Sequence, residues 1–275
     1  MQYFNNLLRR IAADAEEPSA SGKRTNMDPY AVWQDRYDIK VYEADALGRA
    51  SMISLANYVQ NSAARHYTFL DRERGPFLPP NCIWAMSRME LQVLSIPKWQ
   101  DEVTLETWSR GVDRISAVRE FRLLDKAGSA VVLGTTLWVV IDESRRLQRL
   151  NGLSPKWPSL PDRTFINKTP DKVPELGSPS QGPVFRAVYS DLDLNRHVNN
   201  VKYLEWMLDA HPQQFLESRD VQRIGVNFLD SASAGDEIVV NTDRISDSLC
   251  LNNVIRMRDN REICRARLEF GPERK

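Results

Sequence analysis

Asp193, Asn195 and His197 stand at alternate positions and form the part of the sequence best equipped for chemistry. An apolar run with helical spacing follows them, which predicts a helix from about residue 198. The first amides of a helix have no acceptor within it and lie at the positive end of its dipole, which suits a carbonyl oxygen that gains negative charge. A potential base beside an oxyanion site is the minimum that a hydrolase requires.

The same residues also have an ordinary structural interpretation. Asp and Asn are common capping residues, so Asp193 and Asn195 could end a strand and begin a helix, with His197 as a hydrogen-bonded surface residue. Short motifs of this kind often occur by chance. The choice therefore depends on the elements that position the three side chains.

Composition narrows the class of protein. No apolar run in the 275 residues is long enough to span a membrane, and 37 Lys and Arg balance 37 Asp and Glu, which argues against bulk attraction to nucleic acid or membranes. Three cysteines, Cys82, Cys250 and Cys264, lie far apart, so we predict reduced core thiols rather than disulfides or metal ligands. These features predict a soluble cytoplasmic protein.

Residues 1–34 are predicted to be an N-terminal helical extension and linker. Four apolar residues between positions 4 and 11 fall on one helical face, and a polar segment with Ser, Gly and Pro follows. The apolar part is too short for a secretory signal, and the acidic residues after it disfavour an organelle transit peptide.

The rest of the chain shows the same order of elements twice: a strand, a helix and four strands. Shifting residues 86–107 by 135 positions lays them on residues 221–242, so that Arg88 meets Arg223 and apolar residues meet apolar ones. This period is too long for a solenoid and indicates a domain duplication. The expected elements are residues 37–43, 51–67, 83–94, 102–109, 116–124 and 131–140, then 184–190, a helix from 198, 222–229, 237–246, 249–257 and 262–270.

A long helix wrapped by an antiparallel sheet suggests a hotdog fold, so we predict a tandem hotdog of the α+β class. The first unit covers residues 35–150 and the second covers residues 183–275. Between them, residues 151–182 form a Pro-rich connector, which cannot be a helix or a central strand and is expected to cross one edge of the assembly.

The two copies differ at the polar triplet. A shift of 148 positions places Asp45 on Asp193, but Leu47 and Arg49 stand where the second copy has Asn195 and His197. A purely structural cap should serve both halves, so the asymmetry favours catalysis in the second half. The helix of the first half could line an apolar slot for a ligand or could simply pack the core, and the sequence leaves both open.

Three further segments complete a resemblance to a known family. The stretch SDLDLNRHVNNVKYLEW, together with YEADALGRASMISLANYVQNSA, IWAMSRMELQVLSIPKWQDEVTLETW and WVVIDESRRLQRL, resembles the acyl-acyl carrier protein (acyl-ACP) thioesterases of plants and bacteria. The resemblance covers roughly residues 35–271. It implies a tandem hotdog fold that hydrolyses the thioester between a fatty acyl chain and carrier protein, which terminates fatty acid synthesis. We expect the first half to bind the acyl chain.

The resemblance also assigns roles to the site. Asp193 would be the nucleophile or the general base that activates water, and Asn195 and His197 would orient the water and Asp193. The thioester oxygen would be held by backbone amides at the start of the helix. These amides belong to Val198, Asn199 and Asn200.

One position departs from the family pattern. The family usually carries a glutamate on the next strand, where this chain has Ser231. Asp230 is adjacent, but successive strand residues face opposite sides, so it could replace the glutamate only through a bulge or a one-residue misalignment. Plant members have a cysteine where this chain has Ala232, so a Cys-His-Asn nucleophile is excluded.

Carrier proteins are acidic, so a basic patch is expected near the site. Candidate docking residues, which could also be ordinary surface charges, are Arg145, Arg146, Arg149, Arg196 and Lys202. The resemblance implies no cofactor, and the other histidines, His66 and His211, are not at metal-ligand spacing with the triplet.

Two other functions stay open from the sequence. The chain could be a hotdog thioesterase that acts on acyl-CoA or polyketide thioesters, or, with Ser231 in place of the acid, a non-catalytic protein that binds acyl chains or the carrier. A homodimer is also compatible with the sequence, although the duplication already supplies two copies of the fold.

Overall fold

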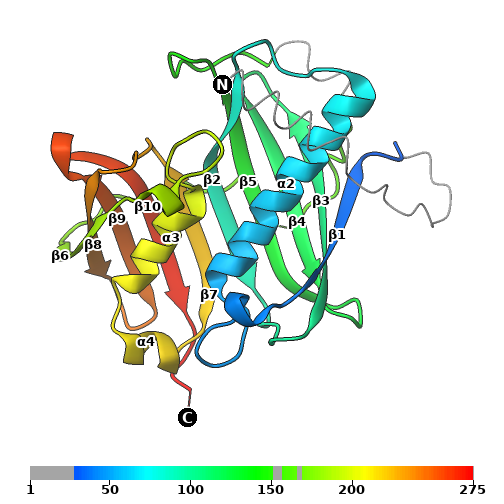
Figure 1. Cartoon of the computed structure of the whole chain (residues 1–275). Coiled ribbons are helices and arrows are strands. Elements are labelled where there is room, and N and C mark those ends of the chain that lie inside the picture. The colour runs from blue at the N-terminus through cyan, green and yellow to red at the C-terminus, as the bar shows by residue number, and fades with distance from the viewer. Residues whose placement is uncertain (1–27, 151–156, 166–168, 275) are drawn as a thin grey trace.

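The structure, a computed structural model, describes residues 28–150, 157–165 and 169–274. Ten antiparallel strands form one continuous sheet in the order β1-β3-β4-β5-β2-β7-β10-β9-β8-β6. Figure 1 shows the helices α2 and α3 side by side on one face of this sheet. This architecture is the predicted tandem hotdog. The predicted N-terminal helix at residues 4–11 lies outside the described residues.

The two halves repeat the same order of elements. The first half consists of β1 (Val32–Asp38), α2 (Met52–Arg74), β2 (Ile83–Val93), β3 (Glu102–Val112), β4 (Ser116–Leu124) and β5 (Ala130–Ile141). The second half consists of β6 (Ser180–Arg186), α3 (Asn200–Asp209), α4 (Gln213–Ser218), β7 (Val221–Phe228), β8 (Glu237–Arg244), β9 (Leu249–Arg256) and β10 (Arg261–Phe270).

The first strand begins earlier than the sequence pattern predicted. β1 starts at Val32, and the expected strand at residues 37–43 is mostly a loop with one turn of 3-10 helix. The buried face of β1 carries Asp35, whose carboxylate accepts a hydrogen bond from Ser62 of α2 at 2.7 Å. A strand is recognised in a sequence by alternating apolar residues, and the buried Asp35 interrupts this alternation. The sequence pattern therefore did not predict the first part of β1. The short helix α4 was not predicted either.

Strands β2 and β7 join the two halves. Met89 pairs with Val226 and Leu91 pairs with Ile224 in antiparallel register. The 135-residue shift equates Met89 with Ile224 and Leu91 with Val226, so equivalent residues pair crosswise. This crosswise pairing is what a two-fold relation between duplicated units produces, and it confirms the duplication.

The connector crosses a face of the sheet rather than an edge, contrary to expectation. Trp108 of β3 donates from Nε1 to the carbonyl of Arg163 at 2.8 Å, and Val173 N donates to Oδ1 of Asn227 on β7 at 2.6 Å. Trp108 follows Thr107, which faces α2, so the connector covers the opposite face. Proline lacks an amide for strand pairing, and the connector instead covers apolar side chains such as Trp108.

The core lies between the helices and the sheet. Ser51 begins α2 by accepting a hydrogen bond from Ser54 N, and the helix buries Leu55, Ala56 and Val59. The three cysteines are free and buried, as expected. In the part of the chain that the structure describes, no helix is both long and apolar enough to cross a membrane.

Candidate active site

The loop before α3 is built on the carboxylate of Asp193. Its Oδ1 accepts hydrogen bonds from the amides of Asn195 at 2.8 Å and His197 at 3.2 Å, and its own amide donates to the carbonyl of His197 at 2.7 Å. Arg196 has a φ of 63°, a left-handed conformation that completes the turn. Asp193 therefore shapes the loop through Oδ1 and leaves Oδ2 for other contacts.

The first half contains the same loop. Oδ1 of Asp45 accepts from the amides of Leu47 at 2.9 Å and Arg49 at 3.0 Å, and Gly48, with a φ of 72°, takes the place of Arg196. An Asp at this position is thus part of the duplicated scaffold. The features specific to the second half are the side chains of Asn195 and His197.

Two of the three amides predicted to hold the thioester oxygen already have acceptors. Val198 N donates to the carbonyl of Ala232 at 3.0 Å, and Asn199 N donates to the carbonyl of Asp191 at 2.8 Å. The prediction is therefore wrong for these two amides. Asn200 is the first residue of α3, where an amide has no acceptor within the helix, and it stays a candidate.

The physical reason lies in the scaffold. In the first half, the corresponding amides of Ala50 and Ser51 donate to Pro97 O at 2.8 Å and Glu43 O at 2.9 Å. In both halves these bonds fasten the loop to the segment that follows β2 or β7 and to the adjacent turn of 3-10 helix. They are structural and do not distinguish a catalytic site.

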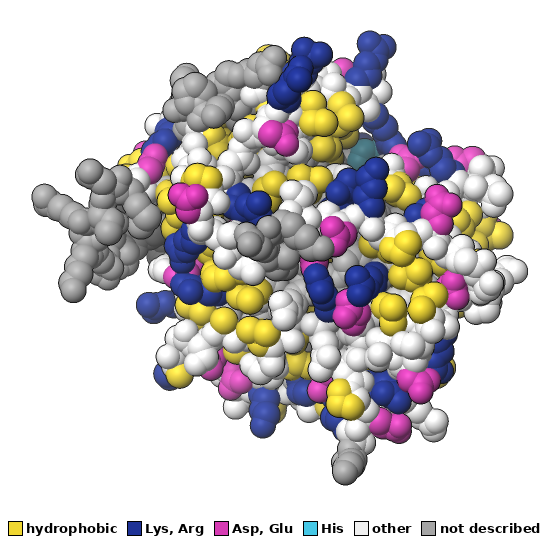
Figure 2. Space-filling model, turned by 180° about the vertical axis from the view of Figure 1, so that it is seen from behind, with side chains coloured by type: hydrophobic (Ala, Val, Ile, Leu, Met, Phe, Trp, Pro, Cys, Tyr) yellow, Lys and Arg dark blue, Asp and Glu magenta, His cyan; other side chains and the backbone are white. Residues whose placement is uncertain are grey.

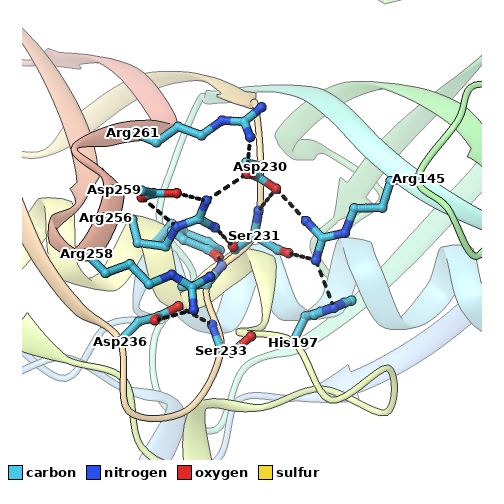
Figure 3. Close-up of polar contacts among 12 residues, drawn as sticks. Arg145, His197, Asp230, Ser231, Ser233, Asp236, Arg256, Arg258, Asp259 and Arg261 are labelled. Carbon is cyan, nitrogen blue, oxygen red and sulfur yellow. Dashed lines mark hydrogen bonds and ion pairs between the residues drawn. The ribbon is translucent and has the colours of Figure 1, made fainter.

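Arg145, from the turn after β5, reaches into this site from the first half (Figure 3). Its Nη2 lies 3.2 Å from Nε2 of His197 and 2.9 Å from Oγ of Ser231. A guanidinium has only donors, so Nε2 of His197 must accept, and the hydrogen of the neutral imidazole is on Nδ1. Sequence reasoning assigned Arg145 to carrier docking and missed this contact, although it lies in one of the segments that resemble the family.

The environment keeps His197 neutral. Partial burial lowers the pKa of His197 below its ordinary value, and the positive charge of Arg145 lowers it further. Asp193 and Asp230 oppose this shift only in part. A neutral imidazole can accept or donate hydrogen bonds in the reaction without carrying charge.

Asp230 is the anchor of Arg145. Its Oδ1 accepts from Arg145 Nη1 at 2.5 Å and from Ser231 N at 2.8 Å, and its Oδ2 lies 3.0 Å from Arg256 and 3.1 Å from Arg261. Burial alone would raise the pKa of Asp230, but the Ser231 amide and the arginines outweigh it, so the pKa lies below its usual value. Asp230 is therefore an ionised anchor rather than a spare acid.

A bulge at the end of β7 explains how Asp230 and Ser231 both reach Arg145. The amides of Leu229 and Asp230 both donate to the carbonyl of Ile263, at 2.9 and 3.0 Å, which breaks the strict alternation of the strand. The sequence analysis required such a bulge if Asp230 were to replace the glutamate of the family, and the bulge is present. Its carboxylate, however, is occupied by arginines.

Asn195 completes the second-half loop. Its Nδ2 lies 3.5 Å from Oδ2 of Asp193, and its Oδ1 is buried without a partner among the described residues. A buried amide oxygen without a donor is costly, so a water or a substrate group is the natural partner. Because the amide of Asn195 also contacts Oδ2 of Asp193, a water bound by Asn195 would lie near this carboxylate.

The other candidate docking residues fall into two groups. Lys202 is held in ion pairs at 3.3 and 2.6 Å with two neighbouring carboxylates. Arg146, Arg149 and Arg196 are exposed. On the face seen in Figure 2, basic and acidic side chains are interspersed, so the charge on that face is not segregated.

The first-half counterpart of the site has Leu47 and Arg49 in place of the amide and the imidazole. A cavity of about 540 Å³ lies beside it, lined by residues including Leu47, Arg49 and His211. Arg49 is held in place by an ion pair with Asp45.

Among the residues that the structure describes, no group of His, Cys, Asp and Glu could hold a metal ion.

Comparisons with known proteins show the family and the fold. The family model of the acyl-ACP thioesterase N-terminal domain matches residues 30–152, and that of the C-terminal domain matches residues 180–272. The structure is similar to an acyl-ACP thioesterase from Bacteroides thetaiotaomicron, with a TM-score of 0.79, 23% identity and coverage of 88% of this chain and 98% of the other. It is also similar to the 12:0-ACP thioesterase from Umbellularia californica, with a TM-score of 0.73, 21% identity and the same coverage.

The curated relatives are longer than this chain. The chain is 27% identical over 241 residues to the chloroplastic oleoyl-acyl carrier protein thioesterase 2 of Arabidopsis thaliana, covering 81% of this chain and 65% of that protein. It is 24% identical over 264 residues to the chloroplastic palmitoyl-acyl carrier protein thioesterase of Cuphea hookeriana, covering 88% and 63%. The chain thus spans somewhat less than two thirds of the length of these relatives.

Proposed function

Because the chain belongs to the acyl-ACP thioesterase family, we propose that it hydrolyses fatty acyl-ACP to a free fatty acid and carrier protein. The second half carries the chemistry, and the first half, whose helix α2 lies beside the site, receives the acyl chain. Gln60 of α2 donates a hydrogen bond from Nε2 to Oδ1 of Asn199 at 3.1 Å, which supports this division because it joins the two halves at the site.

The single observation that carries the proposal is the arrangement of Asp193, Asn195 and His197. Oδ2 of Asp193 is the carboxylate oxygen that the loop amides do not use, and it lies 3.5 Å from Nδ2 of Asn195, whose Oδ1 is buried without a partner among the described residues. We assign Asp193 Oδ2 as the general base for a water positioned by Asn195. The neutral imidazole of His197 is the third polar side chain of this loop.

The test is the release of free fatty acid from acyl-ACPs of several chain lengths, with the matching acyl-CoAs measured in parallel. Asp193→Asn keeps an acceptor oxygen for the loop amides but removes the base, so kcat should fall at least about 10²-fold. Asp45→Asn makes the same change in the first-half loop and is the matched control, expected to retain wild-type turnover.

Two outcomes would contradict the proposal. One is a wild-type protein that binds acyl thioesters and hydrolyses none of them, which would favour the non-catalytic alternative. The other is an Asp193→Asn variant with nearly wild-type turnover. Faster turnover of acyl-CoA than of acyl-ACP would reassign the carrier. Cytoplasmic location and homodimer formation stay predictions.

A further inference from the structure

We propose that Arg145 is a catalytic residue contributed by the first half, and that its Nη2 binds the thioester oxygen as that oxygen becomes negatively charged. This inference rests on the proposed hydrolase function. The starting observation is that Nη2 faces Nε2 of His197 and Oγ of Ser231, two neutral acceptors that a stronger, charged acceptor can replace.

The need for such a donor follows from the helix start. The amides of Val198 and Asn199 are already bound to carbonyls, which leaves Asn200 as the remaining predicted amide. One neutral amide is weak support for an oxyanion, whereas a guanidinium adds a full charge and a hydrogen bond of about twice the strength. Arg145 supplies the charge that the helix does not.

Arg145 is held in position at its guanidinium and at its backbone. Its side chain is fixed by the Asp230 carboxylate through Nη1, which leaves Nη2 directed at the site. Its backbone occupies a tight turn in which Asp142 O accepts from Arg145 N at 2.9 Å and Arg145 has a φ of 60°. A left-handed conformation is unfavourable for a residue with a side chain. Such strain commonly accompanies functional positions.

Ser231 makes the arrangement possible. A glutamate here, as the family usually has, would lie beside the guanidinium and compete for Nη2. The hydroxyl of Ser231 holds Nη2 with a neutral hydrogen bond instead. The departure from the family pattern therefore leaves the donor available to substrate.

The reaction balances as follows. Asp193 Oδ2 takes a proton from water, the water oxygen bonds to the thioester carbon, and the carbonyl electron pair moves onto its oxygen, which accepts from Arg145 Nη2. The pair then returns, the carbon–sulfur bond breaks, and the leaving sulfur takes the proton from Asp193. The products are a carboxylic acid and the free thiol of the carrier. No oxidant or metal is required.

The decisive variants are Arg145→Gly and Arg145→Lys, assayed with the full chain on an acyl-ACP that the wild type hydrolyses. Glycine suits the left-handed turn, so the backbone should fold without strain. We expect Arg145→Gly to lower kcat by about 10²–10³-fold with a much smaller change in KM. Arg145→Lys should retain part of the activity, and millimolar methylguanidinium should partly restore Arg145→Gly.

A matched control removes a similar ion pair nearby. Arg258 pairs with Asp236 at 3.1 Å and is about as exposed as Arg145, but it does not contact His197 or Ser231 (Figure 3). Arg258→Gln should leave kcat unchanged. A second readout is the pH profile: without Arg145, the groups facing His197 are Asp193 and Asp230, so the acid limb of kcat/KM should move to higher pH.

The outcomes separate the possible roles. A rise in KM that depends on salt, with kcat unchanged, would make Arg145 a docking residue and overturn the inference. A rise in kcat would make it an inhibitory clamp on His197 and also overturn it. Loss of activity without methylguanidinium rescue and without a shifted pH profile would mean a structural role. If the wild type hydrolyses no acyl thioester, the proposed function itself fails.

Discussion

Asp45 and Asp193, 148 residues apart, hold their loops in the same way, because Oδ1 of each accepts hydrogen bonds from the amides two and four residues later. Both halves have therefore kept an aspartate whose Oδ1 accepts the same two backbone hydrogen bonds. Only one of the two loops presents an amide and an imidazole beside it. Structural and catalytic use of Asp193 can be separated by the choice of substitution.

Alanine at either aspartate should destabilise the protein. Asp193→Ala leaves two partly buried amides without their acceptor, which should lower the free energy of unfolding by about 1–3 kcal/mol. Asp45→Ala leaves one partly buried and one exposed amide, so its cost should be smaller. Asp193→Asn keeps an acceptor and should cost less than Asp193→Ala. Urea denaturation measures all three. Equal stability of Asp193→Ala and wild type would show that the loop does not depend on the carboxylate.

The oxygen of the product should come from water in one step. If Asp193 is a general base, a single turnover in heavy-oxygen water should place the label in the fatty acid and none in Asp193. If Asp193 is a nucleophile, an acyl-aspartyl anhydride would form and would be detected in an acid-quenched turnover as an acylated peptide, and water attack on its aspartyl carbon would place the label in the side chain. Mass spectrometry of the peptide that contains residue 193 distinguishes the two.

Ser231→Glu should raise the pKa of His197. The new carboxylate would lie beside Arg145 and partly neutralise the guanidinium that now lowers this pKa. Ser231→Ala, which adds no charge, is the control and should leave the pKa almost unchanged. NMR titration of the imidazole measures both variants. An unchanged pKa in Ser231→Glu would mean that position 231 does not face His197 in solution.

His66 should make the protein sensitive to acid. It is 1% exposed, and burial, with the charge of Arg119 as a second cause, lowers its pKa to about 3, while a hydrogen bond to the carbonyl of Tyr30 opposes the shift. The unfolded chain binds this proton from about pH 6.5 downwards. The unfolded state therefore holds more protons, and stability falls as the pH falls towards the folded pKa.

The expected slope can be isolated by substitution. The contribution of His66 should approach about 1.4 kcal/mol per pH unit below pH 6. Unfolding free energies of wild type and His66→Gln, measured between pH 7 and pH 5, should converge as the pH falls, whatever the cost of the substitution at neutral pH. Parallel curves would contradict the assignment of His66 as a buried neutral group.

Much of the fold could be predicted because local patterns encode it. The alternation in residues 83–94 and 222–229 predicts β2 and β7 within a residue or two, and the duplication predicts the shared architecture. The pattern failed at β1, where the buried Asp35 satisfies its charge through a contact with Arg65 of α2. The alternation of apolar and polar residues along one strand does not reveal an ion pair between that strand and a helix.

The sequence by itself determined the duplicated order of elements and the asymmetry that marks Asn195 and His197, because spacing along the chain defines both. Only the tertiary structure decided that Arg145 faces His197 and that Val198 already has an acceptor. The reason is physical. The pairing of strands decides which distant residues become neighbours. It brings Nη2 of Arg145 within 3.2 Å of Nε2 of His197, although the two residues are more than 50 positions apart in the chain.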